Sequence, residues 1–390
     1  MTLSNNNRIQ SIDLLKGLAM VVMALDHTRD YFHFSAFFYD PSDPTQTSLP
    51  IYFTRWITHY CAPIFSFLAG ISAFLLGRRK KTKELSSFLF KRGIWLIFIE
   101  FTIVNFAWYF DLYFRSPGLL VIWSLGVSMI VLAVLVYLPR TFILIFSCVL
   151  IFGHNLFDTI HYDGNILWAI LHDVATFKFS DDFRFYVDYP IIPWIAVMSL
   201  GYWFGHFYDK SFDNVKRKKI LNLIGISAII LFIALRLINK YGDPSPWIHF
   251  NTPSKTFMSF LNLSKYPPSL LYLLMTLGPA LIFLANTENL KGKISNFFSI
   301  FGKVPFFYYI LHLYLIHFIA LLFAQLTGFG WQKMILNDWI TQIPSLKGYG
   351  FSLWVVYLVW FGVIALLYPL CEKFVEYKMN HKEKWWLSYL

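Results

Sequence analysis

Five ionisable side chains lie close together at the end of the first long apolar segment, in the run SIDLLKGLAMVVMALDHTRDYFH at residues 11–33. They are Asp26, His27, Arg29, Asp30 and His33. Charged or titratable groups near hydrocarbon cost free energy and usually mark functional sites. We therefore expect chemistry here. The alternative is that these side chains only cap a helix end in the wet interface.

A histidine beside a carboxylate suits acid–base or nucleophilic chemistry. On a helix, Asp26, Asp30 and His33 share one face, and His27 lies one turn before Asp30 on the neighbouring edge. A carboxylate one turn away can orient an imidazole and raise its basicity, as a general base or nucleophile requires near neutral pH. We predict that Asp30 orients His27, and that His27, Asp30 and His33 are catalytic.

A second polar group precedes the next apolar segment, where Arg55 and His59 share one helix face at a spacing of four. The segment continues as CAPIFSFLAGISAFLLG and carries a stripe of small residues, Ala62, Ser66 and Gly70. Such a stripe allows helices to approach closely. We expect it to pack against the first apolar segment and so bring Arg55 and His59 near the cluster.

Polar side chains also occur deeper in apolar segments. Glu100 lies in mid-segment, and GKVPFFYYILHLYLIHF at residues 302–318 contains His312 and His317. Five positions turn a helix by about 140°, so these two histidines cannot chelate one ion unaided. Each is either a cavity-lining group or a buried histidine bonded to a neighbouring helix. The predicted substrate-binding residues are Asp26, Arg29, Arg55, His59, Glu100, His312 and His317.

The amino-acid composition indicates that the helices carrying these side chains lie in a membrane. The 390 residues are 57% hydrophobic and 20% aromatic, and only 14% are charged. A spanning helix needs about 20 mostly apolar residues. The chain is predicted to be an all-α, polytopic integral membrane protein with about ten transmembrane helices and a single domain, residues 1–390. The ten segments are 11–28, 60–77, 93–110, 118–138, 141–156, 190–207, 220–238, 268–286, 304–326 and 351–371.

The distribution of charge predicts the topology. The net charge of +11 is concentrated in alternate connections, whereas Asp residues gather in the others. By the positive-inside rule, both termini face the cytoplasm and the cluster after residue 25 faces away from it. We therefore expect a multi-pass protein of the cell's inner membrane with its active-site cluster at the extracytoplasmic end, and no nucleic-acid partner.

Several site classes are not indicated. Cys61, Cys148 and Cys371 are scattered and form no CxxC pair, so neither a disulfide framework nor a cysteine-based metal site is predicted. The chain has no HExxH, Walker or GxGxxG motif and no nucleophile elbow. The prolines in DYPIIPW and KYPP are typical of first helical turns. We expect no metal site and no soluble-type nucleotide site.

Four stretches resemble a known family: SIDLLKGLAMVVMALDH, RWITHYCAPIFSFLAGISAFLLG, YPIIPWIAVMSLGYWFG and GKVPFFYYILHLYLIH. Together they resemble bacterial relatives of the heparan-alpha-glucosaminide N-acetyltransferase catalytic domain, within the wider transmembrane acyltransferase superfamily, over nearly the whole chain. The resemblance implies transfer of acetyl from cytosolic acetyl-CoA to a glucosamine amine across the membrane, through a histidine after the first catalytic helix. By position, His33 is nearest to that histidine. His27 stands where the lysosomal member has Asn, and His59 where it has Asp.

The favoured hypothesis is a membrane-bound acyltransferase that moves acetyl from acetyl-CoA to an amino or hydroxyl group of an extracytoplasmic sugar or glycan, without a metal. In it His27, with His33 as its rival, is the general base or a transient acetyl carrier. The anionic CoA would need a basic mouth, for which the stretches 78–81 and 216–219 are available. The alternative is a transporter or flippase for a glycan or small anion. The sequence leaves pairing with a second copy open.

Overall fold

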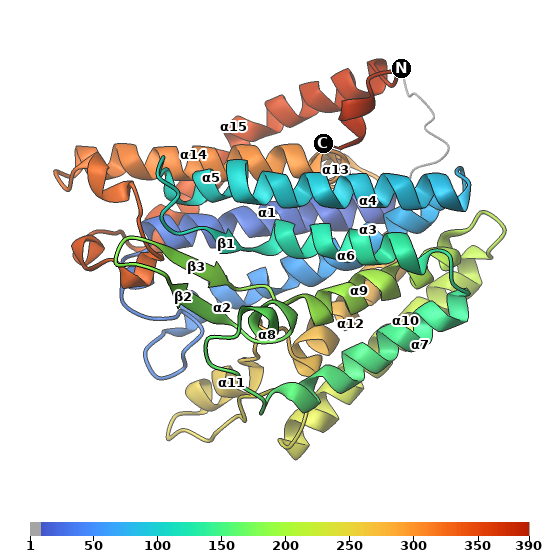
Figure 1. Ribbon diagram of the computed structural model, residues 1–390, viewed down its shortest axis with the longest axis horizontal. Coiled ribbons are helices and arrows are strands. Elements are labelled where there is room, and N and C mark those ends of the chain that lie inside the picture. The colour runs from blue at the N-terminus through green and yellow to red at the C-terminus, as the bar shows by residue number, and fades with distance from the viewer. Residues whose placement is uncertain (1–8, 390) are drawn as a thin grey trace.

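The computed structural model describes residues 9–389 and places a helix at each of the ten predicted apolar segments (Figure 1). These helices are α1 (Gln10–Phe32), α3 (Cys61–Gly77), α4 (Thr82–Ile99) with α5 (Asn105–Tyr109), α6 (Val121–Leu135), α7 (Arg140–Gly153), α9 (Ile191–Phe204), α10 (Asn214–Ile238), α12 (Leu270–Thr287), α14 (Pro305–Leu326) and α15 (Leu353–Asn380). The remaining α-helices are α2 (Leu49–Trp56), α8 (Ile166–Leu171), α11 (Pro253–Leu261) and α13 (Lys293–Lys303).

Short helical turns connect these elements. They are η1 (Phe34–Phe37), η2 (Ile57–Tyr60), the π-helical turn η3 (Glu100–Val104), η4 (His154–Phe157), η5 (Gly205–Tyr208), η6 (Trp331–Met334), η7 (Ile340–Gln342), η8 (Pro344–Leu346) and η9 (Trp385–Ser388). Because η3 joins α4 to α5 without a break, the three elements form one long helix that begins at Thr82. The apolar segment predicted at 93–110 is the C-terminal part of this helix.

Within the described residues, six helices are long and apolar enough to cross a membrane. They are Leu49–Gly77, Arg140–Phe157, Asn214–Ile238, Leu270–Thr287, Pro305–Leu326 and Leu353–Asn380. The helix Val121–Leu135 is apolar but shorter. The predicted class, a mainly helical polytopic membrane protein, is therefore confirmed. The count of ten spans and the orientation stay predictions.

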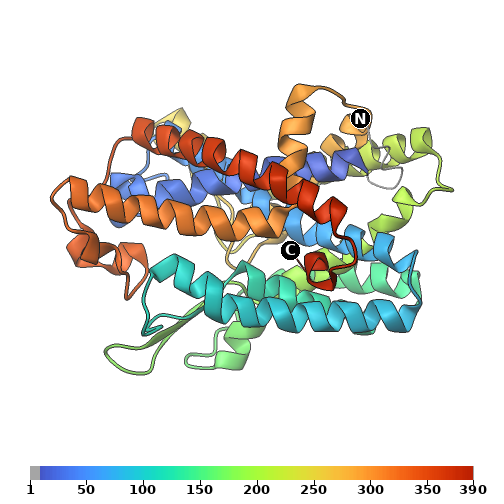
Figure 2. The ribbon, with the colours of Figure 1, turned by 90° about the horizontal axis from the view of Figure 1, so that it is seen from above.

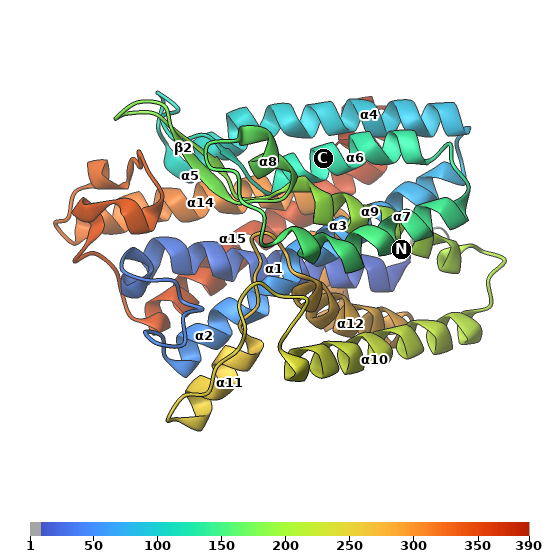
Figure 3. The ribbon, with the colours of Figure 1, turned by 60° about the horizontal axis from the view of Figure 1, so that its bottom comes forward.

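Helix α1 lies at the centre of the bundle and contacts α3, α12, α13, α14 and α15. Figure 2 shows α14 and α15 alongside it, and Figure 3 shows α10 and α12 on another side of the bundle. Its contact with α13 is very close: a Cβ atom on Gly17 would lie 1.7 Å from the carbonyl oxygen of Phe298, and one on Gly302 would lie 1.8 Å from that of Asp13. Glycine at both positions is what lets the two backbones meet.

The small-residue stripe of α3 packs against α9, and the expectation that it packs against α1 is wrong. The hydroxyl of Ser66 donates to the carbonyl oxygen of Trp194 at 3.3 Å, and a Cβ atom on Gly70 would lie 2.0 Å from the carbonyl oxygen of Met198. The reason is that α9 supplies a matching glycine, Gly201. A Cβ atom added to Gly201 would lie 2.0 Å from the backbone of α3. Helix α3 still contacts α1 beside this interface.

A small sheet departs from the all-helical expectation. Strands β1 (Gly118–Leu119), β3 (Arg184–Val187) and β2 (Ala175–Lys178) lie in that order, with β1 parallel and β2 antiparallel to β3. The helix predicted from residue 118 begins only at Val121, because Gly118 pairs with Tyr186 and both its backbone polar groups bond to the side chain of Asn105.

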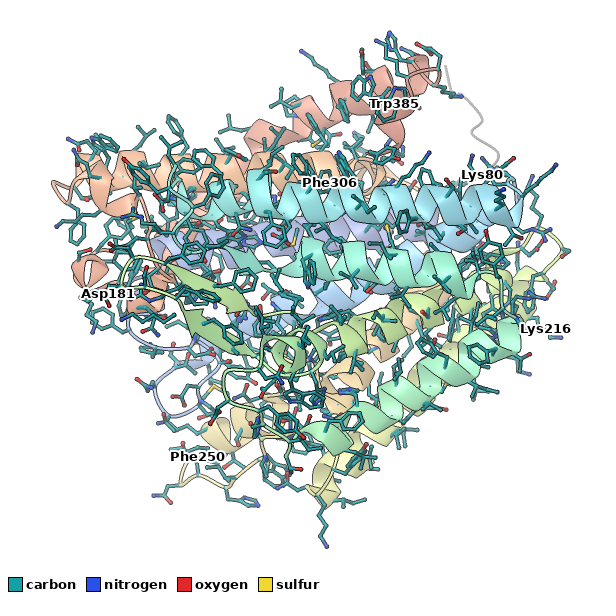
Figure 4. All side chains as sticks on the ribbon, viewed as in Figure 1. Lys80, Asp181, Lys216, Phe250, Phe306 and Trp385 are labelled. Atoms are coloured by element: carbon teal, nitrogen blue, oxygen red, sulfur yellow. The ribbon has the colours of Figure 1, made fainter. Side chains whose placement is uncertain are left out.

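The two ends of the bundle differ in character. Figure 4 places Lys80 and Lys216 at one end and Asp181, in the turn between β2 and β3, at the other. The sheet, α2 and the 327–350 connection lie at the Asp181 end (Figure 1). Helix α4 begins at Thr82, before the apolar segment predicted from residue 93, so its first turns extend toward the Lys80 end. At this start the Lys81 amide donates a hydrogen bond to the Glu84 carboxylate.

We predict that Gly17→Ala lowers the stability of the protein in detergent by about 1–3 kcal/mol or more, because its methyl group would overlap the backbone of α13. Gly362→Ala in α15 is the matched control, since a Cβ atom there meets nothing within 4 Å. Thermal unfolding measures both. Equal melting temperatures for Gly17→Ala and the wild type would contradict the close α1–α13 contact.

Candidate active site

An ion network closes the C-terminal end of α1. The Asp26 carboxylate lies 2.9 Å from Nη2 of Arg29 and also accepts a hydrogen bond from Nη1 of Arg55. Nη2 of Arg29 also donates to Asp30 at 2.5 Å. The Arg29 side chain is only 3% exposed, and such a buried charge persists only when it is paired. As expected, the fold brings Arg55 to the cluster, because α2 and η2 contact α1.

His27 sits next to this network but is not bonded to it. Its ring centroid is 4.7 Å from that of Trp108 and 5.2 Å from that of His312. Both ring nitrogens are buried, and neither has a hydrogen-bond partner within residues 9–389. The expected orientation of His27 by Asp30, in which the imidazole would donate to the carboxylate, is absent from this described region, because the neighbouring Arg29 guanidinium donates to the Asp30 carboxylate instead.

His312 faces His27 from α14 in a defined tautomer. Its Nδ1 lies 2.9 Å from the carbonyl oxygen of Tyr308. A carbonyl oxygen only accepts, so Nδ1 carries the proton, and Nε2 of the neutral ring is left as a proton acceptor. That Nε2 atom is buried and has no hydrogen-bond partner in the described chain. Two imidazoles with uncommitted nitrogens therefore meet where α1 and α14 pack together.

His317, the other histidine predicted on α14, has a different environment. Its Nδ1 lies 2.8 Å from the carbonyl oxygen of Ala107, and its Nε2 lies 2.7 Å from that of Met334. Its ring also stacks on Tyr31 at 4.6 Å. With both nitrogens engaged, His317 connects α5, α14 and η6, which is the arrangement of a structural histidine.

His33 caps the turn that follows α1. Its Nδ1 accepts a hydrogen bond from the backbone amide of Ser35 at 3.2 Å and lies 2.7 Å from the Ser35 hydroxyl. Burial, together with the nearby charge of Arg29, lowers the pKa of His33 to about 4. His33 is therefore neutral at physiological pH, and one of its nitrogens is already engaged.

Glu100 and His59 are both buried, and each makes a hydrogen bond to a neighbouring helix. An oxygen of Glu100 accepts from the amide of Trp123 at 2.8 Å and so caps α6, and its other oxygen has no partner in the part of the chain described. Glu100 also opens the π-helical turn η3, a feature often found at functional sites. The carbonyl of His59 accepts from the Tyr272 hydroxyl at 2.6 Å.

A cavity of about 1310 Å³ leads toward these groups from the Lys80 end. Its mouth is basic and its depth is apolar. The basic lining residues are Lys16, Arg79, Lys80, Lys81, Lys83, Lys91, Arg92, Lys378, Lys382 and Lys384. Apolar side chains from α1, α3, α4, α6 and α14 line the rest, among them Met20, Phe65, Leu125, Met129 and Phe306. Figure 4 labels the lining residues Lys80, Phe306 and Trp385.

The deep end of the cavity approaches the candidate residues on three helices at once. Lining residues Met23, Leu96 and Tyr309 precede His27, Glu100 and His312 by four, four and three positions, respectively. A spacing of three or four places each candidate one helical turn beyond a lining residue on the same helix face. The cavity thus runs from a basic mouth to about one helical turn short of the pair of imidazoles.

Three residues near this site have no place in the sequence-based prediction. Trp108 makes an edge-to-face contact with His27, and the Lys265 ammonium lies within electrostatic range of Asp26, His27 and Asp188. Burial raises the pKa of Asp188 to about 6, although the Lys265 charge opposes that shift. For Asp188 and Lys265, the available signal was a charged residue in the segments DYP and KYPP. The sequence-based interpretation attributed those segments to their prolines, which are typical of first helical turns.

Comparison with known proteins gives one positive finding. The family model described as heparan-alpha-glucosaminide N-acetyltransferase, catalytic, matches residues 8–236. A search of the curated proteins finds no match. The matched stretch begins just before α1 and ends within α10, so it contains the ion network, His27, His59 and Glu100. His312 and His317 lie beyond it.

We predict that Asp26→Asn destabilises the protein by about 3–5 kcal/mol, because two buried guanidinium groups lose the carboxylate between them. Asp181→Asn is the control, since its carboxylate is 95% exposed and an exposed ion pair contributes little to stability. Denaturant or thermal unfolding in detergent measures both. If Asp26→Asn is as stable as Asp181→Asn, the network does not hold α1 and α2 together.

Proposed function

We propose a specific reaction for this chain, which belongs to the heparan-alpha-glucosaminide N-acetyltransferase catalytic family and so to a family of membrane acetyltransferases. The donor is acetyl-CoA, and the acceptor is an amino or hydroxyl group of a sugar or glycan outside the cytoplasm. The observation that carries the proposal is the cavity that runs from a basic mouth to one turn below His27 and His312.

The shape and chemistry of this cavity suit CoA. The phosphates of CoA are anionic and would lie at the lysine-rich mouth, whereas the long, narrow pantetheine arm would occupy the apolar depth. Lys83 and Leu96, both on α4, are thirteen residues apart, which corresponds to about 20 Å along a helix. The thioester would then reach the level of His27. Of the two basic stretches predicted for CoA, 79–81 lines the cavity, and 216–219 is not among its lining residues in the described chain.

His27 is the proposed catalytic residue. The acceptor nitrogen or oxygen attacks the carbonyl carbon of the thioester, His27 takes the acceptor's proton, and the carbon–sulfur bond breaks to release CoA as a thiol. A neutral His27 can also attack the thioester itself, carry acetyl transiently and pass it to the acceptor. In both routes Nε2 of His312 can accept a hydrogen bond from His27 and so orient it, the task expected of Asp30.

The charged groups around His27 would bind the acceptor. Asp26, Arg29 and Arg55 offer both donors and acceptors to sugar hydroxyls, and Lys265 and Asp188 border the same region. By the positive-inside rule, the basic mouth of the cavity faces the cytoplasm of a cell with this protein in its inner membrane. Donor and acceptor then approach His27 from opposite sides, and holding both in one geometry supplies much of the rate.

We predict that His27→Ala lowers acetyl transfer by about 100-fold or more, whereas His33→Asn, which keeps an acceptor for the Ser35 amide, stays within a few-fold of the wild type. Purified protein is given acetyl-CoA and a panel of amino sugars and glycan fragments, and free CoA and acetylated product are followed. Thioester hydrolysis without an acceptor is measured in parallel.

Loss of transfer in His33→Asn together with activity in His27→Ala would show that His33 is the catalytic histidine. If the wild type shows neither transfer to any acceptor nor thioester hydrolysis, the acyltransferase proposal fails and the transporter alternative gains support.

We further predict that replacing Lys80, Lys81 and Lys83 with Gln raises the KM for acetyl-CoA by roughly three- to 150-fold with little change in kcat, since each lost charge costs about 0.2–1 kcal/mol. The control, with the same change in charge, replaces Lys216, Lys218 and Lys219 and should leave KM nearly unchanged. The difference should shrink as salt is added. Equal effects of the two triple variants would contradict the donor position.

A further inference from the structure

A cluster of two histidines and one aspartate lies in a different part of the fold from the candidate active site. His154 begins η4 directly after α7, Asp158 follows η4, and His172 follows α8. In Figure 1 the end of α7 lies below α8. One side-chain ligand atom from each of the three residues lies within 4.8 Å of the other two. The fold therefore brings together, in a small space, side chains from both ends of the 19-residue connection 154–172.

The bonding of these side chains is incomplete. Nε2 of His172 lies 3.1 Å from an oxygen of Asp158, which accounts for one nitrogen of that ring. Nδ1 of His172 and both nitrogens of His154 are buried without a hydrogen-bond partner among residues 9–389, and His154 is only 1% exposed. A buried polar group left unsatisfied costs about 1–3 kcal/mol. A cation bound to an imidazole nitrogen would remove part of this cost.

The carboxylate is held in place by a second contact. Its other oxygen accepts a hydrogen bond from Nδ2 of Asn155 at 2.7 Å, and Oδ1 of Asn155 accepts one from the amide of Leu270 at 2.9 Å. Asp158 is thereby fixed to the start of α12. Hydrogen bonds that orient a ligand from behind are a regular feature of metal sites.

We propose that His154, Asp158 and His172 bind one zinc ion, which fixes the 154–172 connection to the end of α7. Two imidazoles and a carboxylate are a donor set that suits Zn²⁺ better than Mg²⁺ or Ca²⁺. Ligand atoms around tetrahedral zinc lie about 3.4 Å apart, so the 3.1 Å pair already fits and His154 must approach by less than 2 Å. A water molecule or a loop oxygen would fill the fourth position.

This inference differs from the expectation of no metal site, and it does not rest on the proposed acetyl transfer. The three residues belong to α7, η4 and the end of α8, whereas the candidate active site is built on α1, α2, α5 and α14. The zinc ion is assigned a structural role, because it would join two ends of one surface connection. Its test therefore needs no substrate.

The test measures zinc binding by the full-length protein, purified with a histidine-free affinity tag and stripped with a chelator. Zinc chloride, magnesium chloride and calcium chloride are each added alone, and bound metal and melting temperature are measured. We expect about one bound zinc per chain and a higher melting temperature with zinc only. His161→Ala is the matched control, because this exposed histidine of the same connection pairs with Asp173, outside the cluster.

His154→Ala and His172→Ala should each reduce bound zinc at least tenfold and abolish the thermal shift, whereas His161→Ala should behave like the wild type. Asp158→Asn tests the site with a smaller change in shape if the alanine variants do not fold. The proposal is overturned if the stripped wild type neither binds zinc nor is stabilised by it, which would leave a buried water molecule as the partner of these nitrogens. It is also overturned if His154→Ala retains full zinc binding, or if magnesium or calcium stabilises the protein as much as zinc.

Discussion

The candidate site depends on one buried carboxylate, Asp26, which balances the guanidinium groups of Arg29 and Arg55 at the end of the central helix. Burying charge is unfavourable unless the charge is paired, so this network fixes how α1 meets α2. The network also holds the charged side chains nearest to His27 in ion pairs with one another. The imidazole is thereby left without a bond to them and lies beside the ring of His312, whose Nε2 also has no partner among the described residues.

This separation of charge from the imidazole pair matches what acyl transfer requires. A base that is neutral and uncommitted can take a proton from an amine or hydroxyl, whereas a histidine already locked between two carbonyls, as His317 is, cannot. The cavity adds the second requirement, a path that carries one reactant from a basic mouth to the level of the imidazoles. Lys265, which precedes α12, lies within electrostatic range of Asp26 and His27, and Asp188, which precedes α9, lies within range of Lys265.

The sequence predicted the helical segments and the main cluster because hydrophobic periodicity and buried ionisable residues leave strong local signals. It could not predict which partner each side chain chooses. Helical spacing shows that Asp30 can reach His27, but not that the adjacent Arg29 competes for the carboxylate. Nor does it show that α3 meets α9 or that His312 faces His27, since these contacts depend on how distant helices pack. The His154 cluster matches neither a cysteine pair nor an HExxH motif, because its three side chains are spread over 19 residues.

The central claim is that the CoA thiol reaches the level of His27 through the cavity, and disulfide trapping tests it most directly. A cysteine replaces Met23, one turn before His27, in a protein whose native cysteines at positions 61, 148 and 371 are replaced, and activated CoA disulfide is added. Intact-mass spectrometry should find a CoA adduct on Met23→Cys and none on Leu281→Cys, an equally buried position outside the cavity lining. No adduct at Met23→Cys in folded protein, or equal adducts at both positions, would contradict the account.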